Sequence, residues 1–119
     1  MKNILEFVQK KIDVLNVESM AEDLATASAY YYTASSYYAK KESDYSEKYA
    51  ALLEEAMNSS DKKYTAEDRK NIIKGLSAQE KRAVNNAKGL LDSLYIKIES
   101  LRTLISKAKE ELKITKIGE

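Results

Sequence analysis

The sequence predicts an all-α protein built on two long antiparallel, coiled-coil-like helices. The chain has 119 residues, no Pro and only three Gly, so it lacks the residues that tight turns and hairpins require. Charged residues make up 33% of the chain, and its many Ala, Leu, Lys and Glu residues favour helix. Long stretches also repeat apolar residues at steps of three and four. We therefore expect one helical domain over residues 1–119, with one or two short helices beside the long ones.

The first expected element is a short amphipathic helix over about residues 3–15. Five apolar residues recur there at helical steps: Ile4, Leu5, Val8, Ile12 and Leu15. Asn16 and Ser19 then interrupt the pattern. Ser19 and Glu22 have the spacing of a capping box, which is expected to open the next helix.

The second expected element is a long helix over about residues 19–57, with an a/d seam. One track of the seam consists of Leu24, Tyr31, Tyr38, Tyr45 and Leu52, and the other begins with Met20, Ala27 and Ala34 before Lys41 and Lys48. Small Ala residues therefore face large Tyr residues. The polar residues 58–61 are expected to form the loop that ends this helix.

A short helix is expected over residues 65–76, and the last long helix over residues 78–113. Thr65 is the predicted cap of the short helix, and Gly75 weakens or ends it. Ser77 and Glu80 form a second candidate capping box. The seam of the last helix is Val84, Ala87, Leu91, Leu94, Ile98, Leu101, Ile105, Ala108 and Leu112.

The apolar face of the last helix is wider than its seam. Leu90, Tyr95 and Leu104 extend it on the flanks. We expect either the first helix or other subunits to cover this surface, and we favour a homo-oligomer.

Composition argues against several classes of protein. The chain has neither Cys nor His, which removes thiolate sites, the commonest general base and the usual metal ligand. Its paired carboxylates are sequence neighbours and point about 100° apart on a helix, so they do not converge. We expect no enzyme activity, no cofactor and no metal. No apolar run resembles a signal peptide or a membrane span, so we expect a cytoplasmic location (host cytoplasm if viral) and no membrane partner.

A basic stripe of period seven follows the seam of the last helix. With Val84 at position a, the e positions are Lys81, Lys88, Tyr95, Arg102, Lys109 and Lys116. Ion pairs with the facing helix are the usual role of such positions. In an antiparallel hairpin the facing e positions are Ala21, Ser28, Ser35, Glu42, Tyr49 and Ala56, of which only one is acidic. The stripe is therefore expected to face water, carboxylates of another subunit, or a polyanion such as nucleic acid.

Charge is also segregated along the chain. Residues 62–97 hold nine basic and four acidic residues, whereas residues 18–55 hold three basic and eight acidic ones. The further candidate nucleic-acid-binding residues in this basic part are Lys62, Lys63, Arg69, Lys70 and Lys74.

Three tyrosines of the second helix lie off its seam. Core or interface packing accounts for Tyr31, Tyr38 and Tyr45, but Tyr30, Tyr32 and Tyr37 point elsewhere. These rings are candidates for stacking on unpaired bases or for anchoring a protein partner.

The order of these elements resembles the UvsY-like bacteriophage recombination mediators over about residues 18–112. The resemblance rests on the Tyr- and Ala-rich second helix, the helix start at Leu76-Ser77-Ala78 and the Leu, Ile and Arg pattern that ends in Leu101-Arg102. It implies a small helical oligomer that binds single-stranded DNA and helps to load a recombinase. The net charge of +1 departs from the strong basicity of that family.

The sequence thus favours a non-enzymatic interaction protein, first of all a phage-type accessory factor that binds single-stranded DNA in recombination or replication. The alternative is a small helical adaptor or inhibitor that binds a protein through its Tyr-rich face, without nucleic acid.

Overall fold

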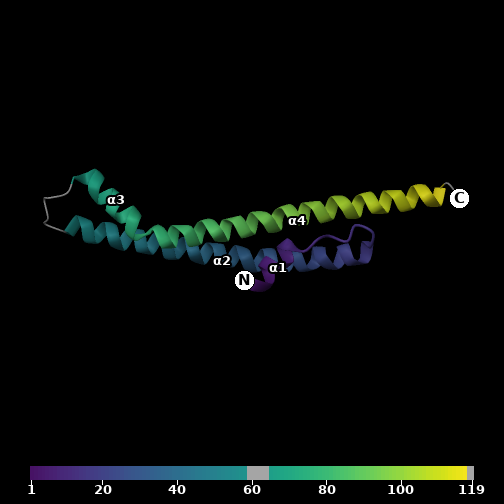
Figure 1. Cartoon of the computed structure of the whole chain (residues 1–119), viewed down its shortest axis with the longest axis horizontal. Coiled ribbons are helices and arrows are strands. Elements are labelled where there is room, and N and C mark those ends of the chain that lie inside the picture. The colour runs from purple at the N-terminus through teal and green to yellow at the C-terminus, as the bar shows by residue number, and fades with distance from the viewer. Residues whose placement is uncertain (59–64, 118–119) are drawn as a thin grey trace. The chain divides into compact units, whose positions relative to one another are not determined.

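The protein is an all-α helical hairpin, as predicted. A computed structural model describes residues 1–58 and 65–117, with side chains described as far as residue 113. These residues form four helices and no strand: α1 (Lys2–Gln9), α2 (Val17–Asn58), α3 (Ala66–Leu76) and α4 (Ala78–Ile117). α2 and α4 are the two long helices of the hairpin (Figure 1). The chain divides into two compact units, a first unit of Met1–Ser35 with Leu90–Glu119 and a second unit of Ser36–Gly89.

α1 is shorter than the helix predicted over residues 3–15. Lys10 adopts an extended backbone (φ −67°, ψ 134°), and its N–H donates back to the carbonyl of Phe7. A turn follows, in which the Asp13 carboxylate accepts from the backbone N–H of Leu15. Ile12 still packs against the core, whereas Leu15 is 94% exposed. The apolar spacing therefore extends beyond the end of α1, and Ile12 reaches the core from the segment that follows this helix.

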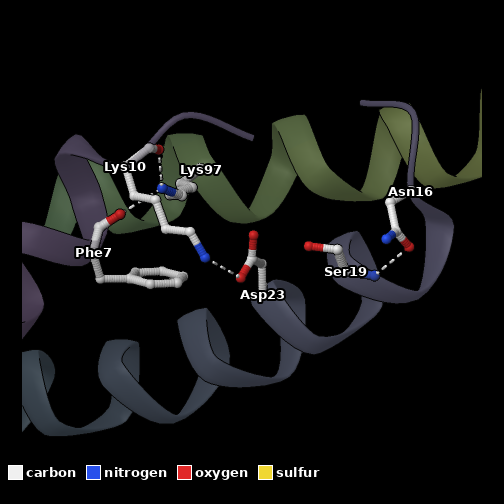
Figure 2. A network of polar contacts seen from close by, with 6 residues as sticks. All are labelled: Phe7, Lys10, Asn16, Ser19, Asp23 and Lys97. Atoms are coloured by element: carbon white, nitrogen blue, oxygen red, sulfur yellow. Dashed lines mark hydrogen bonds and ion pairs between the residues drawn. The ribbon is translucent and has the colours of Figure 1, made fainter. Parts of the chain in front are cut away.

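The N-terminal cap of α2 is Asn16, so the predicted capping box of Ser19 and Glu22 is wrong. The Asn16 side-chain oxygen accepts a hydrogen bond from the backbone N–H of Ser19 at 3.0 Å (Figure 2). The backbone carbonyl of Asn16 accepts from the backbone N–H of Met20. Ser19 thus lies inside the first turn as a donor. Asn16 supplies the acceptor that a helix N-terminus needs.

The core of the first unit contains part of the predicted seam. One cluster of buried side chains joins α1, α2 and α4: Ile4, Phe7, Met20, Ala27, Ala34, Leu94, Ile98 and Leu101. Leu90 and Leu104 pack against the same cluster, so α1 covers part of the wide apolar face of α4. Tyr95 and Leu112 remain more than half exposed.

The second unit contains α3 and the adjoining parts of α2 and α4. Thr65 caps α3 as predicted, in a reciprocal capping box with Asp68. The buried Ser77 hydroxyl donates to the carbonyl of Ile73 at 2.7 Å and so satisfies a carbonyl at the C-terminus of α3. The capping box of Ser77 with Glu80 stays a prediction.

Candidate nucleic-acid interface

The second unit concentrates positive charge on α3 and the start of α4. Between residues 69 and 88 six basic side chains accompany a single carboxylate. We call these six the basic surface: Arg69, Lys70, Lys74, Lys81, Arg82 and Lys88. All are exposed except Arg69, which is half-buried. Five charged side chains of one sign therefore face solvent on two consecutive helices.

The described residues show few ion pairs with the basic surface, although α3 also carries the exposed Glu67 and Asp68 in its first turn. Lys70, Lys74 and Lys88 form no salt bridge with any described residue. Glu80, the only carboxylate between residues 69 and 88, is half-buried, and its Oε2 atom has no described hydrogen-bond partner. The Lys81 ammonium lies over the ring of Tyr45, 5.1 Å from its centroid. Such a cation–π contact leaves the charge of Lys81 in place.

The remaining residues of the predicted stripe differ in their surroundings. Arg102 and Lys109 are exposed on the first unit, and Arg102 forms a surface ion pair with Glu99 at 3.1 Å. Ion pairs between exposed side chains contribute little to stability. The candidates Lys62 and Lys63, and the side chain of Lys116, lie outside the described residues.

The three tyrosines predicted to lie off the seam have three different environments. Tyr30 packs edge-to-face on Phe7, with ring centroids 5.3 Å apart, so it belongs to the core of the first unit. Tyr37 is half-buried beneath the Lys41 ammonium. Tyr32 alone among the three is largely exposed, at 78%.

Two further tyrosines lie next to the basic surface. Tyr45 and Tyr49 are neighbours on α2, with ring centroids 6.1 Å apart. The sequence assigned Tyr45 to the seam and Tyr49 to a flanking position facing the basic stripe. Their spacing of four residues was the signal that both rings share one face of the helix.

The residue that sequence reasoning missed most clearly is Lys97. It counted as one of nine basic residues, yet it is only 7% exposed, at the flanking position between Leu90 and Leu104. Its ammonium donates to the backbone carbonyls of Phe7 and Lys10 and lies 4.5 Å from the Phe7 ring centroid (Figure 2). Lys97 therefore satisfies carbonyls at the C-terminus of α1 and fastens this helix to α4.

Burial and two neighbouring charges change the pKa of the Lys97 ammonium. Desolvation lowers the pKa of its ammonium below the ordinary value of 10.5, the nearby Lys10 acts in the same direction, and Asp23 opposes both. Asp23 is itself 7% exposed and pairs with Lys10 at 3.3 Å. The charged side chains of Lys10, Asp23 and Lys97 all have partners within the first unit. We therefore assign them to the docking of α1 and not to ligand binding.

Two hollows among the described residues, one in each unit, are candidates for binding sites. In the second unit, a pocket of about 290 Å³ lies between α2 and α3, with walls from Tyr49, Leu53 and Met57 and with Arg69 and Lys70 on its α3 side. In the first unit, a shallow groove of about 440 Å³ runs between residues 8–14 and α4. None of the described residues that line the groove is aromatic. The Lys97 ammonium in it already donates to two backbone carbonyls. The pocket combines an aromatic ring with cations.

Other kinds of site are missing from the part of the chain that the structure describes. It holds no group of three or more acidic side chains placed to bind a metal ion. None of its helices is long and apolar enough to cross a membrane. Comparisons of the chain with protein-family models, with curated proteins and with solved structures find no match.

Proposed function

We propose that the protein is a non-enzymatic accessory factor that binds single-stranded DNA through the basic surface of its second unit. The observation that carries this proposal is the ratio of six cations to one half-buried carboxylate over residues 69–88. Phosphate contacts from Lys and Arg supply most of the sequence-independent affinity for nucleic acid. The overall charge of +1 does not oppose this, because exposed charges beyond about 10 Å are screened at 0.1 M salt.

Single strands fit this surface better than duplexes because aromatic rings lie beside it. Tyr45 and Tyr49 occupy α2 next to Lys81, and unpaired bases stack on such rings. The resemblance to UvsY-like mediators suggests a role in phage-type recombination or replication, in the host cytoplasm.

The test is the binding of a labelled single-stranded oligonucleotide, followed by fluorescence anisotropy at several salt concentrations. We expect affinity to fall steeply between about 50 and 200 mM salt, by counterion release. Lys70→Glu, Lys81→Glu and Lys88→Glu combined should weaken binding more than about tenfold and reduce the salt slope by about 2. The matched control reverses Lys2, Lys11 and Lys107, which are exposed on the first unit and change the net charge equally. Salt-independent binding, or equal loss in both variants, contradicts the proposal.

A second candidate function is that of an adaptor or inhibitor that binds a protein partner. Its support is Tyr32, a ring 78% exposed on the first unit, since tyrosine is enriched in interfaces. Retention of one specific partner by the purified protein, lost on Tyr32→Ser but kept in the triple Lys→Glu variant, favours this function over DNA binding.

We also propose that the chain forms a homo-oligomer. Ile96 and Tyr95 of α4 stay 64% and 55% exposed although α1 covers the neighbouring part of this helix. A light-scattering mass measured on the purified protein tests this. A monomer mass at about 100 μM chain contradicts it, because that concentration exceeds the Kd of most specific assemblies.

A further inference from the structure

We infer that the pocket between α2 and α3 receives one unstacked base of the single strand while Lys70 binds a neighbouring phosphate. The inference rests on the proposed function, and it adds a defined site to a surface that otherwise binds by charge alone. Such a site favours single strands over duplexes, whose bases are already paired and stacked.

The walls of the pocket suit a flat apolar group. Tyr49, Leu53 and Met57 line it from α2, and Ile73 lines it from α3. Leu53 and Met57 are 42% and 76% exposed, so apolar surface of the pocket is accessible to a ligand. Its volume of about 290 Å³ is at the lower limit for small-molecule sites, which suits one ring system and not a larger ligand.

The charges around the pocket indicate that the flat ligand group carries a negatively charged neighbour. Among the described residues, Arg69 and Lys70 are the charged side chains that line it, and no described carboxylate does. Lys70 is exposed and forms no salt bridge with a described residue. An apolar, partly aromatic pocket with a cationic rim therefore matches an aromatic base joined to a phosphate.

The basic surface continues from this rim. Lys74 follows Lys70 by one turn of α3, and both are exposed. A strand that places one base in the pocket can thus extend its backbone along further cations. Tyr45, beside Tyr49 and beneath Lys81, offers a second ring within the same unit.

The experiment compares a labelled single strand that carries bases with an abasic strand of the same length and charge. Both strands present the same phosphates, so only a base-binding site separates them. We expect the wild-type protein to bind the base-bearing strand roughly 5- to 150-fold more tightly, the range of stacking on one aromatic side chain. Equal binding of the two strands overturns the inference and leaves the proposed function intact. Failure to bind either strand overturns both.

Variants locate the effect in the pocket. Ala56→Phe fills it from a half-buried lining position, and Ala51→Phe is the matched control at an exposed position of the same helix outside the pocket. Ala56→Phe should remove the preference for the base-bearing strand while leaving the affinity for the abasic strand unchanged. The control should keep the preference. A preference that survives Ala56→Phe contradicts the assignment to this pocket.

A second variant tests the same pocket independently, in case Ala56→Phe does not fold. Tyr49→Leu removes the ring but keeps an apolar side chain, and Tyr32→Leu is its control on the exposed tyrosine of the first unit. We expect the preference to fall at least about fivefold in Tyr49→Leu alone. Loss of the preference in Tyr32→Leu instead would assign base binding to the first unit and overturn the inference.

Discussion

The two units of the protein differ in how they use their side chains. In the first unit, α1 joins α2 and α4 around a cluster of eight buried apolar residues. In the described part of the second unit, only Ile73, Val84 and Ala87 are buried apolar residues, and residues 69–88 hold six basic side chains and a single carboxylate. The difference suggests that the first unit supplies most of the stability and the second supplies the binding surface.

The largest expected effect that separates the units is that of Leu94→Ala. Leu94 is fully buried in the first unit, and its truncation should lower the free energy of unfolding by about 2–5 kcal/mol. Leu52→Ala removes the same atoms from a half-buried position in the second unit and should cost roughly 1 kcal/mol. Urea denaturation followed by circular dichroism measures both. Equal losses would contradict the proposed division of stability.

The next effect concerns the polar contact that fastens α1. Lys97→Met keeps the apolar stem but leaves the carbonyls of Phe7 and Lys10 without their donor. We expect a loss of about 1–3 kcal/mol in the free energy of unfolding, the range for an unsatisfied buried group. Lys107→Met, at an exposed position of the same helix, is the control and should change little. An unchanged stability would show that relief from burying a charge offsets the lost hydrogen bonds.

Helix caps provide a smaller and more evenly matched comparison. Asn16→Ala in the first unit and Thr65→Ala in the second each remove a side-chain acceptor from a helix N-terminus. Each should cost about 1 kcal/mol. Ser19→Ala, at the position where the sequence placed the cap of α2, should be nearly neutral in thermal denaturation. A larger loss in Ser19→Ala than in Asn16→Ala contradicts the observed cap.

The smallest expected effect is a pH dependence from Lys97. Because burial lowers its pKa in the folded state, the unfolded chain binds more protons between that lowered value and 10.5. This residue therefore makes the free energy of unfolding rise with pH in that window. The measurement is the slope of stability against pH in the wild-type protein minus the slope in Lys97→Met, which cancels the ionisation of the tyrosines. A difference of zero or of opposite sign contradicts a lowered pKa.

The surface that we propose for DNA was only partly visible in the sequence. Period-seven spacing identified Lys81 and Lys88, and charge counting identified Arg69, Lys70 and Lys74, all of which lie in the second unit. Spacing alone did not place Tyr49 against α3, because the direction in which α3 packs depends on contacts distant in sequence. The pocket is a product of that packing.

The sequence by itself determined the helices and their buried seam. Met20, Ala27, Ala34, Leu94 and Leu101 are buried as the heptads predicted, because helical periodicity acts over neighbouring turns and is encoded locally. The tertiary structure determined the burial and the contacts of residues beside the seam. Lys97 became a buried donor and Tyr30 a core ring only because α1 docks there. A flanking side chain takes its environment from whatever packs against it, and no local spacing specifies that partner.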